Sequence, residues 1–224
     1  MAVTYEQLKN DPQVRAYIEA GNDAMKALGI TEHSFPHVCH TAETAAMILL
    51  DLGHSEKTAE LAKIAGLLHD IGNMLNRKYH APAGAEVART ILERLGMSYE
   101  DIGLVCSAIG NHDEGTGKPV NVISAALIIA DKADVRRSRV QETCIELIMS
   151  DIHDRVNYAV TRAEIYPIKD GDKTFVRLCL DLDSEFTPVL DYFEIFLTRM
   201  VMCRRSAAFL GAEFELFING SKIV

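Results

Sequence analysis

The sequence predicts a mostly α-helical protein with a small α+β unit at its C-terminal end. Apolar residues recur at helical spacing up to about residue 158, as in amphipathic helices. After that point the pattern alternates on both sides of Asp170-Gly171-Asp172, which is typical of a β-hairpin. We therefore expect a helical domain over 1–158. A unit of antiparallel strands and one long helix, packed on that domain, is expected over 159–224.

Caps and glycines predict where the first helices begin and end. Asp11 followed by Pro12 indicates an N-cap and a first helical position, and opens a helix towards Gly29. The next two helices are expected over HVCHTAETAAMILLDLG and SEKTAELAKIAGLLHDIG, which both end at a glycine.

The rest of the helical domain follows the same reasoning. Helices are expected over APAGAEVARTILERLG, from Ser98 to near His112, over ISAALIIADKADVRR and over ETCIELIMSDIHDRVNYA. The segment HDEGTGKPVN between two of them is predicted to be a loop, because it contains glycines and a proline. In the C-terminal unit, strands are expected over AVTRAEIYPIK, KTFVRLCLDLD and AEFELFING, and a long amphipathic helix from Ser184.

Charge and cysteine usage exclude several classes of protein. The net charge is -9, from 32 acidic and 23 basic residues. Such a surface repels polyphosphate backbones, so we expect no nucleic-acid polymer as partner, whereas a small phosphorylated substrate remains compatible. The 5 cysteines form no CxxC pair, which argues against a disulfide framework and a structural zinc site and favours the cytoplasm. No signal peptide or membrane-spanning run is visible, so no membrane partner is expected.

Histidines and aspartates stand at helix ends or on apolar faces, where polar side chains are costly. They are His40, His69, Asp70, His80, His112 and Asp131. A buried carboxylate costs several kcal/mol unless it is paired or binds a metal. A single such histidine is more simply a core residue with satisfied hydrogen bonds. The whole set, with imidazoles and carboxylates but no thiolate, favours an open site for a first-row divalent metal.

The order of these motifs resembles the HD-domain superfamily of metal-dependent phosphohydrolases, whose fold is a helical bundle. The motifs are HTAETA (40–45), GLLHDIG (66–72), HAPAGAEVA (80–88), AIGNHDEGTGKP (108–119) and IIADKAD (128–134). The resemblance covers about residues 35–140 and is closest to the bis(5'-nucleosyl)-tetraphosphatase-like branch. The C-terminal unit resembles no family. Asn73 stands where the central motif often continues with lysine, so a cation is missing there.

The resemblance implies a role for each matching residue. The implied metal ligands are His40, His69, Asp70 and Asp131. The implied catalytic residues are Asp70, His80 and His112. His80 and His112 are also expected to contact phosphate or to hold a second ion. Apart from the resemblance, Lys132 and Arg136 follow Asp131 along the chain and are expected to bind substrate, since an arginine suits phosphate; surface ion pairs with Asp134 and Glu142 are the open alternative. The cofactor would be one divalent ion, with a second as the open alternative, chosen from Mn, Fe, Co, Mg and Ni.

The implied activity is hydrolysis of a small phosphorylated substrate, with a nucleotide as the expected case, by attack of metal-bound water. Two alternatives stay open: a catalytically silent nucleotide-binding sensor, suggested by Asn73 and the unfamiliar C-terminal unit, and a di-iron oxygenase. His37 shares a helix face with His40 but matches no motif, and His33 is expected at the surface or as a cap, like the remaining histidines. Arg139 is expected to form surface ion pairs. The long C-terminal helix could equally cover the helical body or form the seam of a homodimer.

Overall fold

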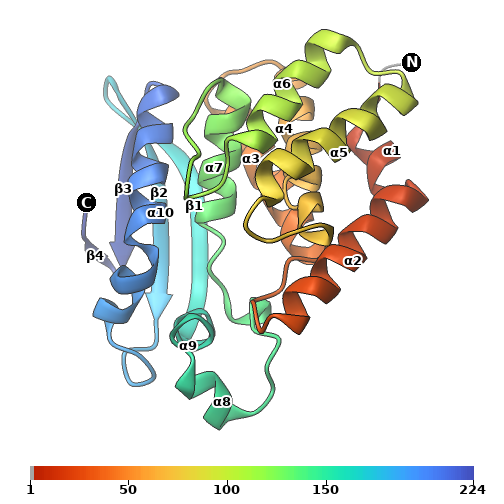
Figure 1. Cartoon of the computed structure of the whole chain (residues 1–224). Coiled ribbons are helices and arrows are strands. Elements are labelled where there is room, and N and C mark those ends of the chain that lie inside the picture. Colours follow the sequence, from red (N-terminus) through yellow and green to blue (C-terminus); the bar gives the residue numbers. More distant parts are fainter. Residues whose placement is uncertain (1–2) are drawn as a thin grey trace.

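A bundle of helices forms the N-terminal part of the molecule (Figure 1). The computed structural model describes residues 3–224, so the first two residues of the expected helical domain lie outside it. The α-helices of this part are α1 Tyr5–Lys9, α2 Pro12–Ala27, α3 Phe35–Asp51, α4 Glu56–Leu68, α5 His80–Leu95, α6 Tyr99–Gly110, α7 Val122–Lys132, α8 Ile145–Ser150 and α9 Ile152–Ala159. Short 3-10 helices lie at η1 Ile71–Met74 and η2 Arg137–Arg139. The mostly helical fold class predicted from the sequence is confirmed.

Side-chain caps explain several helix starts. The Asp11 carboxylate accepts hydrogen bonds from the backbone N–H groups of Gln13 and Val14, directly ahead of Pro12. The Ser55 hydroxyl accepts one from Thr58 at the start of α4. These contacts satisfy N–H groups that have no partner inside the helix, and they fix the start of each helix at the expected residue.

A four-stranded sheet and one long helix form the C-terminal part. Its elements are β1 Val160–Asp170, β2 Lys173–Leu182, α10 Val189–Phe209, β3 Glu213–Ile218 and β4 Ser221–Lys222. The strands lie in the order β1-β2-β3-β4. The pairs β1–β2 and β3–β4 are antiparallel as expected, but β2 and β3 pair in parallel. The parallel pair follows from α10, which carries the chain back to the same end of the sheet.

Four helix boundaries differ from the sequence prediction. The helix α4 ends at Leu68 and not at Gly72, because Asp70 has a non-helical backbone and a 3-10 helix begins at Ile71. The expected last helix of the body is divided between α8 and α9, because Asp151 is extended (φ -100°, ψ 123°) and its side chain caps α9. The helix α7 ends at Lys132 and does not continue to Arg137, since Asp134 turns inward and is buried against His37. The helix α10 begins at Val189, after Pro188, and not at Ser184.

The two parts share one hydrophobic core. The helix α10 packs along α7 and covers β2 and β3, while β1 lies beside α3 (Figure 1). Buried apolar side chains run without a break from α1 to β3. The division at residues 158 and 159 therefore stays a prediction, although α9 gives way to β1 next to it. Within residues 3–224 no helix combines the length and hydropathy needed to cross a bilayer.

Candidate metal centre

Histidines and aspartates from separate helices converge in the helical body. The buried members of this histidine–aspartate cluster are His33, His37, His69, Asp70, His80, His112 and Asp131. They come from the start of α3 and the residues before it, the end of α4, the start of α5, the end of α6 and the last turn of α7. Their convergence in the core requires a physical explanation, because buried polar groups are costly without partners.

The adjacent pair His69-Asp70 can face the same interior because the helix ends there. His69 is the C-terminal cap of α4, and Asp70 already has a non-helical backbone (φ -98°, ψ 3°). Gly72 then allows the next segment to come close to α5, since a Cβ at this position would lie 2.1 Å from the carbonyl oxygen of His80. This close approach brings His80 next to Asp70.

One group of donor atoms in the cluster has the spacing of ligands around a single ion. The Nε2 atom of His37 lies 3.3 Å from Nε2 of His69, 3.5 Å from Oδ2 of Asp70 and 3.4 Å from Oδ1 of Asp131. The Nε2 atom of His69 lies 3.3 Å and 3.6 Å from the same two oxygens. Two ligands that are each about 2.1 Å from one ion are roughly 3 to 3.6 Å apart, so these four atoms fit a common ion.

A second group of donor atoms shares Asp70 with the first. The Nε2 atoms of His80 and His112 are 3.1 Å apart, and they lie 3.5 Å and 3.8 Å from Oδ1 of Asp70. Asp70 thus presents Oδ2 to one histidine pair and Oδ1 to the other. The arrangement has donors for one ion and for a second ion beside it.

The orientation of the imidazole rings leaves their Nε2 lone pairs facing one another. In all five rings of the cluster Nδ1 lies within hydrogen-bonding distance of an oxygen, which for His33 is the backbone oxygen of Thr31. In the other four rings Nε2 also faces the Nε2 atom of another ring. The Nδ1 pairs of these four are His37 with Asp134 Oδ2 at 2.7 Å, His69 with Gly66 O at 2.7 Å, His80 with Arg77 O at 2.7 Å and His112 with Ile109 O at 2.6 Å. Because Nδ1 carries the proton in such pairs, neutral rings would place two Nε2 lone pairs about 3 Å apart unless a cation lies between them. Histidines that bind metals usually show this arrangement.

The electrostatics differ between the two groups. Burial lowers the pKa of His69, but the carboxylates of Asp70 and Asp131 outweigh it and raise the pKa to about 10. Burial lowers the pKa of His112 to about 3, with help from the charges of His69 and Lys132. Burial also lowers the pKa of His80. The His37–His69 group therefore attracts positive charge, and the His80–His112 group stays neutral.

Four cationic side chains complete the wall of the cavity that contains the cluster. They are Arg77, Lys132, Arg139 and Arg199. The cavity has a volume of about 10 Å³, which is room for about one water molecule. Four cations and only two carboxylates, those of Asp70 and Asp131, line it. Cationic side chains therefore gather at this cavity within an acidic protein, although Asp131, Asp134 and Glu114 pair with three of them.

The structure brings together most of the residues that the sequence singled out. His69, Asp70, His80, His112 and Asp131 all lie in the histidine–aspartate cluster. Lys132 lines the cavity, with its Nζ 2.6 Å from Oδ2 of Asp131.

His40 and Arg136 lie outside the cluster, contrary to expectation. The His40 side chain is 44% exposed, and its Nε2 lies 3.8 Å from Asp134. One helical turn earlier, His37 takes the expected place among the donor atoms. The guanidinium of Arg136 pairs with Asp134, with Nε 2.5 Å from Oδ1, and it does not line the cavity.

Two residues expected at the surface are buried in the site. His33 is 8% exposed, and its Nε2 lies 3.9 Å from Oδ2 of Asp70. Arg139 is 4% exposed and donates to the backbone oxygens of Glu32 and Asp134. The signal for His37 was present in the sequence: it stands in the first turn after Ser34, and the other cluster residues also stand at helix ends.

Arg77 supplies the cation that the sequence lacks at position 73. Its Nη1 donates to Oδ1 of Asn73 at 3.3 Å and lies 3.9 Å from Oδ1 of Asp70. Arg199 comes from α10, far along the chain, and its Nε donates to Oε1 of Glu114 at 2.7 Å. Neither arginine belongs to a motif, so no local pattern predicts its place in the site.

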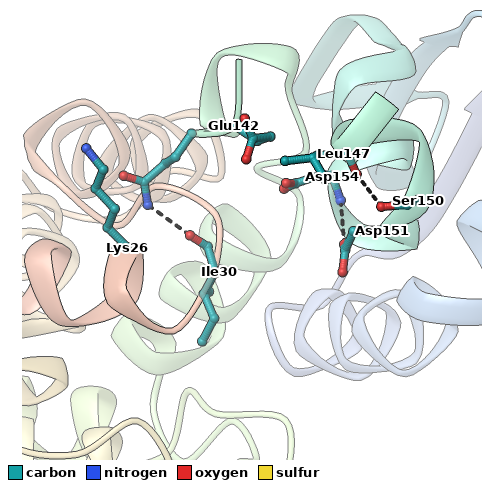
Figure 2. Close-up of a pocket in the computed structure, with 9 residues that line it drawn as sticks. Lys26, Ile30, Glu142, Leu147, Ser150, Asp151 and Asp154 are labelled. Carbon is teal, nitrogen blue, oxygen red and sulfur yellow. Dashed lines mark hydrogen bonds between the residues drawn. The ribbon is translucent and has the colours of Figure 1, made fainter. Parts of the chain in front are cut away.

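A larger cavity of about 380 Å³ lies elsewhere, between the end of α2 and the helices α8 and α9 (Figure 2). Two of its three acidic residues, Glu142 and Asp151, have structural partners. Asp151 caps α9, and Glu142 accepts hydrogen bonds from the backbone N–H groups of Thr143 and Cys144. Its lining includes no residue of the histidine–aspartate cluster.

Fold and site together define a helical protein with a mixed imidazole–carboxylate centre suited to a divalent ion. A family model described as the HD domain matches residues 35–156, which is more than half of the chain. The chain therefore belongs to the HD domain family, as the motif resemblance implied.

The chain is similar over most of its length to several curated proteins. It is 29% identical over 164 residues to a ribonuclease Y from Aliarcobacter butzleri, covering 70% of this chain and 30% of that protein. It is 24% identical over 239 residues to a ribonuclease Y from Fervidobacterium nodosum, covering 92% of this chain and 45% of that protein. An uncharacterized protein from Methanocaldococcus jannaschii is 24% identical over 203 residues, with 81% and 76% covered. The chain thus spans less than half the length of these two ribonucleases.

Proposed function

We propose that this protein is a metal-dependent phosphohydrolase that cleaves a small phosphorylated substrate, a nucleotide in the first instance. The observation that carries the proposal is the set of Nε2 atoms that face one another and the carboxylates of Asp70 and Asp131. Membership of the HD domain family supports the same chemistry. The tetraphosphatase-like branch is part of this proposal.

His37, His69, Asp70 and Asp131 would hold the first ion. A divalent ion there supplies Lewis acidity towards a phosphoryl oxygen and acidifies a bound water. Asp134 fixes the His37 ring through Nδ1, so that Nε2 stays available as a donor atom. The proposed ion is one of Mn, Fe, Co, Mg and Ni, which all bind nitrogen and oxygen donors.

His80 and His112 are better suited to a second ion than to direct contact with phosphate. Their Nδ1 atoms lie next to backbone oxygens, and burial lowers the pKa of both side chains. Neutral rings in this tautomer present a lone pair at Nε2 and have no proton to give to a phosphate oxygen. We therefore assign these two residues, with Asp70, to a second ion.

The cationic wall supports an anionic substrate. Arg77, Lys132 and Arg199 line the same cavity as four of the candidate ligands, which are Asp70, His80, His112 and Asp131. Phosphoryl transfer needs neutralisation of charge and positioning more than covalent chemistry, and such side chains provide both. Arginine also binds phosphate oxygens in a bidentate manner.

The test is elemental analysis of the purified protein together with a phosphate-release screen over nucleotides in the presence of Mn, Co, Fe and Mg. Asp70→Asn should abolish release and leave the fold intact, because Asp70 faces both groups of donors. Asp51→Asn, at an exposed position at the end of α3, is the matched control. Unchanged turnover in Asp70→Asn refutes the proposal. Bound metal without release from any nucleotide favours the sensor, and turnover that requires iron and oxygen favours the oxygenase.

Cleavage of RNA is the second candidate, because relatives of this chain are named ribonuclease Y. The net charge of -9 and the narrow cavity count against a polymer substrate. An RNA oligomer in the same screen separates the two candidates: shortened RNA with intact nucleotides would replace the first proposal by the second.

A further inference from the structure

The loop between α6 and α7 contacts the C-terminal helix beside the metal centre. Within this loop, Oε1 of Glu114 accepts a hydrogen bond from Nε of Arg199 at 2.7 Å and lies 3.8 Å from Nζ of Lys132. Lys132 and Arg199 both line the cavity of the histidine–aspartate cluster. One carboxylate therefore pairs closely with Arg199 and more loosely with Lys132, whose nearer partner is Oδ2 of Asp131 at 2.6 Å.

The cavity is too small for a substrate phosphate as it stands. Its volume of about 10 Å³ holds about one water molecule, so a phosphate can enter only if a side chain moves. Asp70 and Asp131 are buried among the candidate ligands and are held by several contacts. Glu114 does not line the cavity itself, but it contacts Arg199 and Lys132, which do. It is 30% exposed and belongs to a loop, so it is the acidic group whose departure most easily frees these two cations.

Arg199 is prepared to bind a second anion. Its guanidinium carbon lies over the ring of Phe196, 4.5 Å from the ring centroid, and this cation–π contact helps to hold the side chain in place. Among residues 3–224 its two Nη groups have no hydrogen-bond acceptor, because Glu114 uses Nε alone. A carboxylate and a phosphate compete for the same N–H groups, and a dianionic phosphate engages more of them.

We propose that Lys132 and Arg199 form a phosphate-binding subsite beside the metal centre, and that Glu114 occupies it until a phosphate displaces its carboxylate. The ligand is a phosphate group of the substrate, and α10 thereby contributes to substrate binding. This inference rests on the proposed function.

The test is calorimetric titration of the protein with inorganic phosphate, without metal and with Mn²⁺. Glu114→Gln should bind phosphate about fivefold more tightly than the wild type, the scale of a partly exposed ion pair. Arg199→Gln should bind phosphate at least about fivefold less tightly than the wild type. In the double variant, Glu114→Gln should no longer increase the phosphate affinity. Arg199→Lys should recover part of the affinity. Glu194→Gln and Arg205→Gln, at exposed positions of α10, are matched controls and should not differ from the wild type.

Hydrogen exchange gives a second readout that does not depend on turnover. Backbone amides of residues 113–120 should exchange faster in Glu114→Gln, and equally fast in the wild type once phosphate is added, since both changes release the loop. The inference is overturned if the wild type and Glu114→Gln bind phosphate equally tightly. It is also overturned if Glu114→Gln increases the phosphate affinity by the same factor when Arg199 is replaced by Gln. The metal-free titration decides this even if Mn²⁺ does not bind, whereas failure to bind any metal overturns the proposed function alone.

Discussion

Replacing His37 and, separately, His40 by alanine tests the assignment of the metal ligands most directly. His37 is fully buried, and its Nε2 lies 3.3 to 3.5 Å from the other three donor atoms of the first group. The side chain of His40 is 44% exposed and touches none of those atoms. The two residues lie on one helix, one turn apart, so each variant is the control for the other.

The magnitude follows from the number of contacts that each variant loses. Residues that only orient a ligand change metal affinity by about 10-fold to 100-fold, so loss of His37, a ligand itself, should weaken Mn²⁺ binding by about 100-fold or more. That corresponds to roughly 2.8 kcal/mol or more. His40→Ala should stay within about twofold of the wild type, because no donor atom is lost.

The assay is Mn²⁺ titration followed by calorimetry, with circular dichroism and thermal unfolding as a check on the fold. His37→Asn, which keeps a polar side chain, shows whether a loss reflects missing ligation and not a cavity in the core. The reasoning is refuted if His40→Ala loses as much affinity as His37→Ala, or if a folded His37→Ala binds Mn²⁺ as the wild type does.

Three further outcomes are expected from the structure. Gly72→Ala should destabilise the fold by about 1–3 kcal/mol in urea unfolding and weaken Mn²⁺ binding, because the new Cβ would lie 2.1 Å from the carbonyl oxygen of His80. Asp11→Ala should cost about 1–2 kcal/mol at pH 7, since Asp11 caps α2 and pairs with Arg94 at 2.7 Å. Burial raises the pKa of Asp11, but Arg94 and the capped N–H groups outweigh it and lower the pKa. This stabilisation is therefore fully present above about pH 3.9, the pKa of an aspartate in the unfolded chain. It is lost as the pH falls through the lower pKa of Asp11 in the folded protein, so it should be smaller in unfolding measurements near pH 3. Removing metal with a chelator should lower Tm, since metal at about 100 times its Kd stabilises the fold by about 2.7 kcal/mol.

Matched controls accompany these outcomes. Gly103→Ala, on an open face of α6, should be neutral or stabilising by up to about 1 kcal/mol, because its Cβ meets nothing within 4 Å. Asp23→Ala, at an exposed position of α2, should show no comparable loss at pH 7. The role of Gly72 is contradicted if Gly72→Ala is as stable as the wild type. The role of Asp11 is contradicted if the stability loss in Asp11→Ala is as large at low pH as at pH 7. The metal prediction is contradicted if the chelator leaves Tm unchanged.

Local sequence signals predicted the helical fold because caps and periodicity act within a few residues. Asp11 and Ser55 begin their helices through contacts with the next turn, and this information lies in the sequence itself. The parallel pairing of β2 with β3 depends on where α10 packs, which is a property of the tertiary structure. The break at Asp151 has a local cause, since Asp151 is a good N-cap in the middle of an apolar run.

A site residue could be predicted from the sequence only where the residue that a motif singles out is also the one that the fold places in the histidine–aspartate cluster. His69, Asp70 and Asp131 are fixed by helix ends, which can be read from the sequence. The choice between His37 and His40 depends on which face of α3 meets α4 and α7, and one turn of a helix separates the alternatives. Arg77 and Arg199 reach the cavity through tertiary packing, so their local sequence carries no sign of the role.

The position of Arg199 on α10 also affects how such proteins diversify. The candidate metal ligands all lie within residues 35–156, the span matched by the family model, whereas this arginine lies outside it. If Arg199 binds a phosphate group as we propose, changes in the C-terminal segment would alter which anions bind while the candidate metal ligands stay constant. Related chains with a different segment after the helical domain would keep the same chemistry and differ in selectivity. Replacing this segment in one relative by that of another would then change which anion is preferred, without changing any candidate metal ligand.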